Sequence, residues 1–248
     1  MTSDDPFGLA GTACILTGAT SAVGLACARR LVQQDAAVVL VDDDRDRLEE
    51  AASTIGGTAV VGDPASEHTA EEAAATAMIR TGKLDVLIHC DMVQRRLALD
   101  DTDMHEWDSI LAVNLRGAFA FARVALRAMS AYGSGAIVLV TPLAGTVPVL
   151  PGAGAFAATT SGVHGLTRAL ARAGGKDGVR ANAVALGYLD TPTTRGWSDE
   201  EREAAAAATP LGRAGRADDA ASAAVWLASS AAAFVTGAVL RVDGGLAA

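Results

Sequence analysis

Tyrosine and lysine are scarce in this chain, and their scarcity restricts the acid–base chemistry that it can perform. The 248 residues include two tyrosines, Tyr132 and Tyr188, and two lysines, Lys83 and Lys176. Residues four positions apart share one face of a helix, where an ammonium can lower the pKa of a neighbouring phenol. Neither tyrosine has a lysine four positions further on. The sequence therefore excludes catalysis by a tyrosine–lysine pair on one helix.

Cysteine and positive charge are also in short supply. Cys14, Cys27 and Cys90 show neither a CxxC spacing nor a metal-binding pattern, so we expect buried free thiols and no metal site. The chain has 20 Lys and Arg residues against 29 Asp and Glu residues, for a net charge of −9. Such an acidic protein is a poor partner for nucleic acids and anionic membranes, and we expect neither as a partner.

Targeting segments and long apolar runs are missing from the printed sequence. The first residues, MTSDDPFGLAG, are acidic and lack the apolar stretch of a secretory signal. No uninterrupted apolar run reaches the roughly 18 residues typical of a membrane span. We therefore expect a cytoplasmic protein.

Short runs rich in β-branched residues alternate with helical-period segments along the chain. Continuously apolar strands separated by helices are typical of a parallel sheet covered on both faces, with right-handed crossovers. We predict one domain, residues 1–248, with an α/β, doubly wound, Rossmann-like parallel sheet. The expected strands cover residues 12–16, 37–41, 58–61, 84–88, 136–140, 179–184 and 238–242. The expected helices cover residues 23–34, 45–54, 67–80, 104–130, 156–173 and 218–229, with a short helix at the alanine run 204–208.

A glycine-rich turn follows the first expected strand. Residues 17–24 read TGATSAVG, and its candidate cofactor-binding positions are Gly18, Ser21, Val23 and Gly24. Such a turn lets the backbone approach a pyrophosphate, and the helix that follows supplies N–H donors. Eighteen residues after Gly24, the second strand ends at Asp42, where a carboxylate can bind ribose hydroxyls of NAD and repel the 2′-phosphate of NADP. The combination predicts a dinucleotide site of the NAD type.

Further motifs occur in order along the rest of the chain. Asp63 follows the third strand, and residues 84–88 read LDVLI, 113–119 VNLRGAF, 187–191 GYLDT, 210–213 PLGR, 218–220 DDA, 235–237 VTG and 242–245 VDGG. Together with the glycine turn, these motifs resemble the short-chain dehydrogenase/reductase (SDR) family over essentially the whole chain. The resemblance implies an SDR-type fold, cofactor contacts at Asp63 and Thr191, and a retained catalytic position at Asn114.

The sequence departs from this resemblance at the catalytic positions. In SDR enzymes a Tyr exchanges a proton with the substrate, and a Lys four residues later lowers its pKa and holds the nicotinamide ribose. A Ser orients the substrate oxygen, and an Asn ties the site to a water chain. Here Phe156 stands at the Tyr position, Thr160 at the Lys position and Pro142 at the Ser position. Asn114 alone matches, so hydride transfer of the family type is not expected.

A second departure lies where the family carries its NNAG motif. The corresponding residues are His89-Cys90-Asp91-Met92. A carboxylate and a long side chain replace small residues beside the adenosine part of the cofactor, so the resemblance implies that NAD(H) binding is weakened or lost. His89 is a candidate substitute acid–base residue, because open α/β sheets bind ligands at the carboxyl ends of their strands.

Threonines offer further possible substitutes. The loop between Gly145 and Phe156 is one residue longer than usual in the family, so Thr141 is an alternative occupant of the serine position. Thr159 and Thr160 are expected to line the same cleft.

Three functions remain open on these grounds. The first is a redox-silent SDR protein that acts as a structural or regulatory subunit beside an active SDR, in a homo- or hetero-oligomer formed through the helices at 104–130 and 156–173. The second is an enzyme with changed, non-redox chemistry (a cyclase, dehydratase or lyase) or a residual NAD-dependent oxidoreductase. The third is a module that senses a nucleotide or small molecule.

Overall fold

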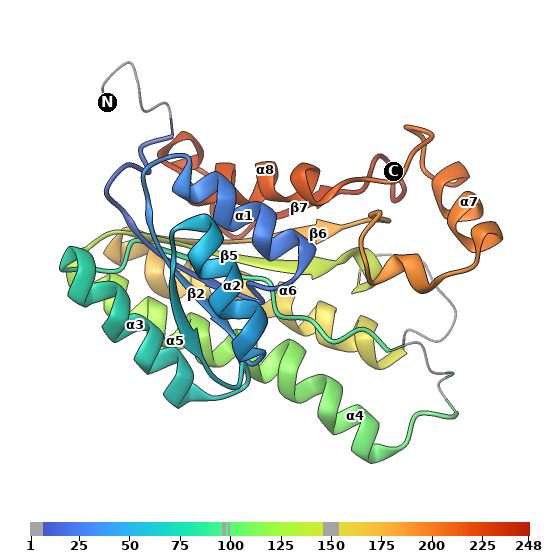
Figure 1. The fold of residues 1–248 in the computed structure, drawn as a ribbon, viewed down its shortest axis with the longest axis horizontal. Helices are drawn as coiled ribbons and strands as arrows, with labels where there is room; N and C mark the ends of the chain where they lie inside the picture. The colour runs from blue at the N-terminus through green and yellow to red at the C-terminus, as the bar shows by residue number, and fades with distance from the viewer. Residues whose placement is uncertain (1–6, 96–97, 99, 146–153) are drawn as a thin grey trace.

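Seven parallel strands form the centre of the protein (Figure 1). The computed structural model describes residues 7–95, 98, 100–145 and 154–248. The strands lie in the order β3-β2-β1-β4-β5-β6-β7, so the chain winds outward in both directions from β1 and β4. The predicted doubly wound parallel sheet is confirmed. The strands are β1 (Ala13–Thr17), β2 (Ala37–Asp42), β3 (Thr58–Val61), β4 (Val86–His89), β5 (Gly135–Pro142), β6 (Val179–Leu186) and β7 (Val239–Val242).

The predicted carboxyl ends of the strands differ most in β5 and β6. Each extends two residues beyond its predicted end, because Thr141 pairs with Ala185 and Pro142 with Leu186. The apolar pattern alone predicted earlier ends for both strands. Pro142 can still belong to β5, because a proline is tolerated at the end of a strand. The extension brings Pro142 to the carboxyl edge of the sheet.

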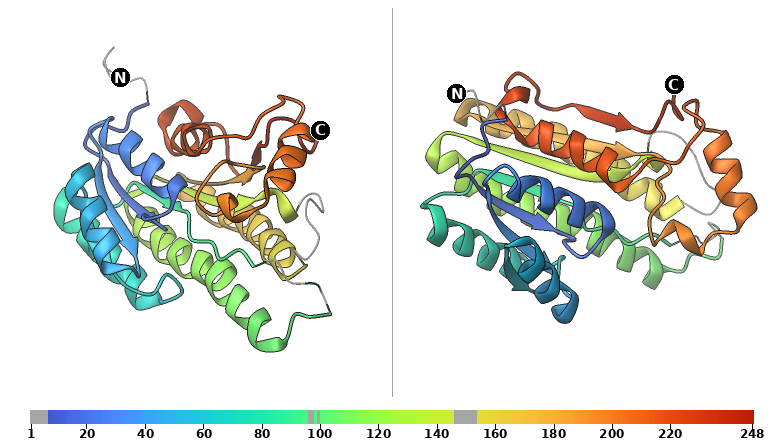
Figure 2. Two further views of the ribbon diagram at one scale, coloured as in Figure 1. Left: turned by 45° about the vertical axis from the view of Figure 1, so that its right-hand side comes forward. Right: turned by 45° about the horizontal axis from the view of Figure 1, so that its top comes forward.

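Helices cover both faces of this sheet (Figures 1 and 2). The core on one face includes buried side chains of α1 (Ala22–Val32), α2 (Arg45–Ile55) and α8 (Ala217–Ala228). The core on the other face includes those of α3 (Glu67–Thr81), α5 (Ala118–Tyr132) and α6 (Gly154–Gly174). The strands between them are buried on both sides, which is why their sequences are continuously apolar.

Side-chain caps explain where several helices begin. Ser21, Asp44 and Ser66 accept backbone N–H groups at the starts of α1, α2 and α3. Ser198 and Glu201 form a reciprocal capping box at α7 (Asp199–Ala207), the short helix expected at the alanine run.

One long helix runs from Met104 to Tyr132. It consists of α4 (Met104–Leu111), the π-helical segment η1 (Ala112–Gly117) and α5. This helix is long and apolar enough to cross a membrane, with 44% of its most apolar window buried inside the protein. Phe121, Ala125 and Met129 on its inner face belong to the core beneath the sheet. Burial against the sheet accounts for the apolar residues on this inner face.

Candidate functional site

A cleft of about 1010 Å³ opens at the carboxyl edge of the sheet. Its wall is built from the glycine turn after β1, the residues after β2 and β4, the ends of β5 and β6, and the inner side of α7. Open parallel sheets bind ligands at this edge, where the strand order reverses. The volume is at the upper end of small-molecule and cofactor sites.

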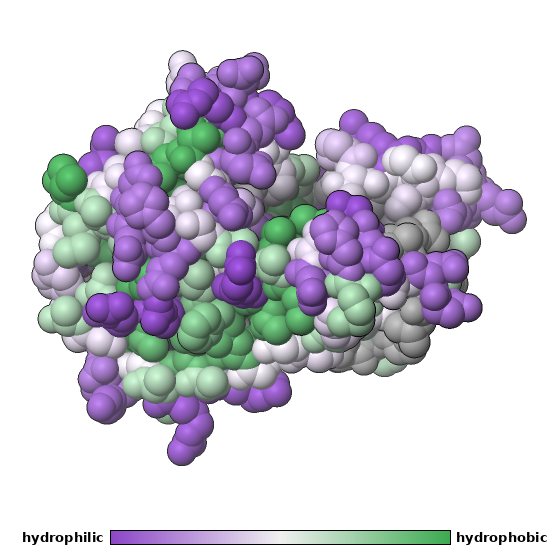
Figure 3. Space-filling view, turned by 90° about the horizontal axis from the view of Figure 1, so that it is seen from below, coloured by the Kyte–Doolittle hydropathy of each residue, from purple (hydrophilic) through white to green (hydrophobic). Residues whose placement is uncertain are grey.

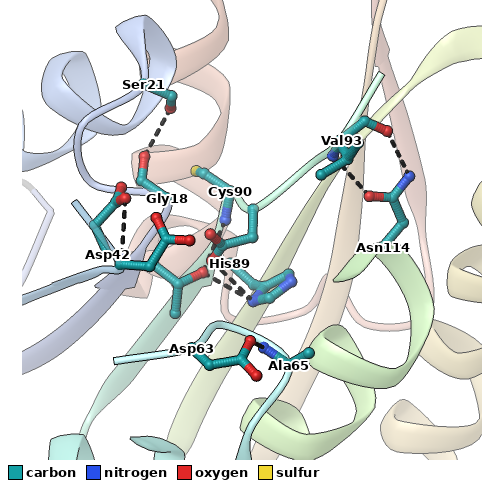
Figure 4. Close-up of polar contacts among 12 residues, drawn as sticks. Gly18, Ser21, Asp42, Asp63, Ala65, His89, Cys90, Val93 and Asn114 are labelled. Atoms are coloured by element: carbon teal, nitrogen blue, oxygen red, sulfur yellow. Dashed lines mark hydrogen bonds and ion pairs between the residues drawn. The ribbon is translucent and has the colours of Figure 1, made fainter. Parts of the chain in front are cut away.

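The glycine turn packs directly against the end of β4 (Figure 4). Gly18 has φ of 60°, and a Cβ there would lie 2.7 Å from the carbonyl carbon of Cys90 and 2.8 Å from the nitrogen of Asp91. Ser21 donates its hydroxyl to the carbonyl of Gly18 at 2.7 Å and accepts the N–H of Gly24 at 3.0 Å. Gly18, Ser21 and Val23 line the cleft, so the start of α1 faces it as a phosphate-binding turn requires.

Gly24 supports the turn from behind. A Cβ at this position would lie 2.2 Å from the carbonyl oxygen of Gly18. The residue is therefore needed for the turn to close, and it contributes to a ligand site through that geometry.

Asp42 is held in place by the backbone around it. Its Oδ2 accepts the N–H of Thr20 at 2.9 Å, and its Oδ1 accepts the N–H of Asp43 at 3.0 Å. Arg47 of α2 lies beside it on the cleft wall and donates to the carbonyl of Thr20 at 2.9 Å. The fixed carboxylate faces the cleft, as a ribose-binding group would.

Asp63 takes a different position from Asp42. It is exposed, and its Oδ1 accepts the N–H of Ala65 at 2.8 Å (Figure 4). The carboxylate stabilises the turn before α3, and the described cleft wall does not include it.

Phe156 and Pro142 both line the cleft. Phe156 is 3% exposed and belongs to α6, while Pro142 ends β5. Thr160 is 2% exposed, and its hydroxyl donates to the carbonyl of Phe156 at 3.0 Å. Thr159 donates to the same carbonyl at 2.8 Å. Neither threonine is part of the described cleft wall, so the expectation that the two line the cleft is corrected. Both hydroxyls are satisfied on the preceding turn of their own helix.

Thr141 points away from the cleft. Its hydroxyl lies 3.0 Å from Nε2 of His164 and 3.3 Å from the carbonyl oxygen of Val184. Successive side chains of a strand face opposite sides of the sheet, so Val140 and Pro142 line the cleft and Thr141 does not. This placement corrects the alternative that Thr141 occupies the serine position. The loop on which that alternative rested, residues 146–153, lies outside the described residues.

Asn114 connects the long helix to the segment after β4. Its Oδ1 accepts the N–H of Val93 at 2.8 Å, and its Nδ2 donates to the carbonyl of Val93 at 3.0 Å (Figure 4). The residue lies in the π-helical segment η1. Such bulges are frequent at functional sites, and this one orders the chain beside the cleft.

His89 lies behind the cleft wall at the end of β4. It is 2% exposed, and its Nδ1 lies 2.8 Å from the hydroxyl of Thr17, within hydrogen-bonding distance. Its Nε2 has no hydrogen-bond partner among the described residues. Burial lowers the pKa of His89 to about 4, so the imidazole is neutral at physiological pH.

Asp91 is a carboxyl of the cleft wall with a raised pKa. Burial raises its pKa to about 7, the hydroxyl of Thr17 and the backbone of Gly18 oppose that shift, and the charges of Asp42 and Asp43 add to it. Its Oδ2 lies 3.9 Å from Nδ1 of His89. That distance does not mark an ion pair, because burial favours the neutral form of both groups.

Cys90 is a buried thiol without an activating neighbour in the described structure. The neighbouring Cys27 thiol and burial raise its pKa well above the ordinary range, and Asp91 adds to this shift. A reactive cysteine needs a lowered pKa, so a nucleophilic role is disfavoured. Among the residues that the structure describes, no three His, Cys, Asp or Glu side chains gather in a possible metal site.

The outer part of the cleft is aromatic and apolar. Tyr188 and Trp197 stack with ring centroids 5.4 Å apart and an interplanar angle of 16°. Thr191, one of the expected cofactor positions, lines the cleft beside them. Sequence reasoning missed Trp197, Glu201 and Arg47 as wall residues, because no motif marks them and their places depend on how α2 and α7 pack.

Four features together define a class of oxidoreductases with a dinucleotide-binding fold. They are the order of the strands, the glycine turn, the carboxylate at the end of β2 and the π-bulge in the long helix. The chain belongs to the short-chain dehydrogenase/reductase family. A family model described as enoyl-(acyl carrier protein) reductase matches residues 18–247.

Relatives extend over nearly the full chain. A cis-4-hydroxycyclohexanecarboxylate dehydrogenase of Sinomonas cyclohexanicum is 38% identical, covering 94% of this chain and 96% of its own. A galactitol 2-dehydrogenase (L-tagatose-forming) of Cereibacter sphaeroides is 36% identical and covers 96% of each chain. The crystal structure of gox2181 superposes with a TM-score of 0.92 at 30% identity and covers 96% of each chain.

Proposed function

We propose that this protein is a redox-silent SDR, which serves as a structural or regulatory subunit beside an active SDR paralogue. One observation carries the proposal. At the two catalytic positions that face the cleft, the structure has Phe156 and Pro142, and neither side chain can donate or accept a proton. The third position, Thr160, uses its hydroxyl within its own helix.

The loss is large in energetic terms. A positioned general acid contributes about 10²–10⁴-fold to a reaction rate. When catalytic residues act as a unit, removing one of them abolishes most of the rate contribution of the whole set. Tyr188 lines the cleft, but it is stacked on Trp197 and burial raises its pKa. A phenol with a raised pKa and no adjacent lysine is a poor replacement for the family's tyrosine.

We expect NAD(H) to bind weakly to the cleft. Gly18, Ser21 and Val23 would hold its pyrophosphate, and Asp42 the adenosine ribose, while the carboxyl of Asp91 stands beside the turn. NAD(H) supplies a hydride donor or acceptor when bound, and the residues present fit its adenosine half better than its reactive half. No residue at the positions of the family's Tyr and Lys would orient a substrate carbonyl.

The proposed assembly uses the helices beneath the sheet. Seen from below, apolar surface gathers at the centre of the face that includes α3, α4 and α5 (Figure 3). Met104 and Phe119 on the long helix are 69% and 49% exposed. A paralogue with matching long helices would cover such a face. The acidic charge further supports the expectation that nucleic acids and anionic membranes are not partners.

Turnover and co-purification together test this function. The purified chain, supplied with NAD⁺ and cis-4-hydroxycyclohexanecarboxylate or with NADH and a panel of ketones, should be at least about 10²-fold slower than the Sinomonas dehydrogenase. Affinity purification from the native host should recover a second SDR in a stable ratio. Turnover comparable to the relative would overturn the redox-silent role, and a homo-oligomer alone would overturn the subunit role.

Non-redox catalysis is a second candidate, favoured by the neutral His89 and the perturbed Asp91 at the end of β4. Perturbed titratable groups cluster at active sites. Any lyase, dehydratase or cyclase activity found should fall in both His89→Ala and Asp91→Ala, and an activity unaffected by either substitution removes this candidate.

A further inference from the structure

The part of the cleft beside β5, β6 and α7 is apolar, and we call it the apolar half. Strand β4 separates β5 and β6 from β1, so this half is distinct from the glycine turn. Its wall includes three buried side chains and three half-buried ones, namely Leu143, Phe156 and Leu186, and Pro142, Tyr188 and Trp197.

The threonines around the apolar half use their hydroxyls within the protein. Thr160 donates to the carbonyl of Phe156, and Thr141 faces His164 on the other side of the sheet. Thr194 donates to the carbonyl of Leu189 at 2.6 Å. Among the described residues, no buried side-chain atom that lacks a hydrogen-bond partner belongs to the wall of this half. A site that selects a polar ligand holds buried polar groups for it, and none is held ready here.

Charge also disfavours an anionic ligand in the apolar half. Three of the four charged side chains on the described wall, Asp42, Asp91 and Arg47, belong to the side of the glycine turn. The fourth is Glu201 of α7, whose carboxylate accepts the N–H of Ser198 at 2.9 Å. An anion would lose its hydration here and meet a carboxylate without a cation on the described wall.

Aromatic rings dominate the apolar half. The rings of Tyr188 and Trp197 are nearly parallel, with centroids 5.4 Å apart and an interplanar angle of 16°. Phe156 adds a third ring to the same cleft wall from α6. Contacts between aromatic rings have preferred geometries and add affinity beyond the burial of apolar area. The wall is therefore suited to an aromatic ligand.

Helix α7 supplies the small side chains of this half. It stands at the carboxyl edge of the sheet, away from the other helices (Figures 1 and 2). None of its residues is buried, and Ala204 and Ala205 line the cleft. A ring bound against these alanines would remove their apolar surface from water and hold α7 to the rest of the protein.

We infer that the apolar half binds an uncharged aromatic molecule, which acts as the regulatory ligand of this protein by fixing α7. This inference rests on the proposed redox-silent role, because a regulatory subunit can respond to a ligand that it does not convert. The ligand needs no carbonyl or hydroxyl group, since Phe156 and Pro142 cannot exchange a proton with one. It also needs no NAD(H), whose adenosine half would lie at the glycine turn.

Calorimetric titrations of the full chain with naphthalene and 2-naphthoate test the ligand class. One naphthalene should bind per chain, and 2-naphthoate should bind at least about tenfold more weakly, because its carboxylate meets no cation. Saturating ADP, which corresponds to the adenosine half of NAD, should change the affinity for naphthalene by less than about twofold if the two sites are independent.

Two variants of α7 form a matched pair that tests the site. Ala205→Phe places a ring in the apolar half and should weaken naphthalene binding at least about tenfold. Ala207→Phe lies on the same helix but outside the described wall, so it should keep the wild-type affinity. Neither position is buried, so both variants should fold.

Substitutions of Trp197 test the aromatic contact. Trp197→Ala removes a ring from the wall and should weaken naphthalene binding at least about tenfold, whereas Trp197→Phe keeps a ring and should restore most of the affinity. Bound naphthalene should also slow hydrogen exchange of the α7 amides, because it ties the helix to the protein. The amides of α3, which contributes nothing to the described cleft wall, should exchange at an unchanged rate.

Several outcomes would overturn the inference. Absence of naphthalene binding, equal binding of 2-naphthoate or an unchanged affinity in Ala205→Phe excludes the ligand class or the site. Displacement of naphthalene by ADP would place it at the glycine turn instead. Binding without slower exchange in α7 excludes the regulatory effect. The redox-silent role is judged separately, because ketone turnover comparable to that of the relatives would overturn it whether or not naphthalene binds.

Discussion

Replacement of Asp91 by asparagine should stabilise the protein at neutral and alkaline pH and leave its stability near pH 4 almost unchanged. Burial raises the pKa of Asp91 from 3.8 to about 7, so between these values the folded protein keeps a proton that the unfolded chain has released. The folded state is therefore most favoured below pH 3.8, and stability is lost as the pH rises to about 7. A difference of roughly 3 pH units corresponds to about 4 kcal/mol as an upper limit.

His89 opposes this trend over part of the same range. Burial lowers its pKa from 6.5 to about 4, so the unfolded chain binds a proton there that the folded protein refuses. Its contribution is full above pH 6.5 and is lost as the pH falls to about 4, with a limit of about 3 kcal/mol. The two effects nearly cancel in the wild type. Asp91→Asn removes one of them, so the variant should gain stability steadily from about pH 4 to about pH 6.5.

Urea unfolding followed by tryptophan fluorescence at a fixed protein concentration measures these free energies. The gain from Asp91→Asn should be about 1 kcal/mol at about pH 4.5 and up to about 4 kcal/mol at about pH 8.5. Glu50→Gln, on the exposed side of α2, is the matched control and should change stability by less than about 0.5 kcal/mol at every pH. A gain under about 1 kcal/mol at pH 8.5, or an equal gain at pH 4.5, would refute the assignment of a buried charge to Asp91.

Three further substitutions probe the cleft. The double variant Phe156→Tyr/Thr160→Lys should have a turnover at least about 10²-fold below that of an active SDR. Its serine position remains altered, and position 160 is 2% exposed, which disfavours a charged ammonium. Substantial ketone reduction by this variant would contradict the proposed loss of the catalytic set. Gly18→Ala should lower the free energy of unfolding, measured in urea, by several kcal/mol, because the added Cβ would lie 2.7 Å from backbone atoms. The control Gly56→Ala has a φ of 89° and open space around the added Cβ, so it should lower this free energy by only about 1–2 kcal/mol. Asp42→Asn should reduce the preference for NADH over NADPH by about tenfold in fluorescence titrations, since the 2′-phosphate no longer meets a carboxylate, and an unchanged ratio would argue against ribose binding at this residue.

Local sequence was sufficient to predict most of the architecture. Apolar strands separated by helical-period segments predicted the sheet. The caps at Ser21, Asp44 and Ser66 were not predicted, although their residue types are typical of helix starts. Strand ends were less predictable, because β5 extends as far as its pairing with β6 allows. Pairing between distant segments is not encoded in a short window of residues.

Placement of the site residues depended on orientation as well as on motif. Phe156 and Pro142 lie on the cleft wall as the sequence predicted. Their positions were obtained by counting residues from a motif within one helix and one strand, which needs no knowledge of tertiary packing. Thr141 was misplaced as an alternative, since a one-residue step along a strand turns a side chain to the other face. Trp197 carried no signal at all, because its stacking on Tyr188 arises from the packing of the segment before α7.

By itself, the sequence determined the fold class and the residue types at the catalytic positions, both of which depend on local order along the chain. The scarcity of tyrosine and lysine led to the prediction that the family's usual proton transfer is absent. Only the tertiary structure decided which groups are neutral at the carboxyl edge of the sheet. His89 and Thr17 are 72 positions apart, and Asp91 acquires its raised pKa from burial and from the charges of Asp42 and Asp43. Protonation is set by the water and charges that folding removes or brings near, and no stretch of sequence contains that information.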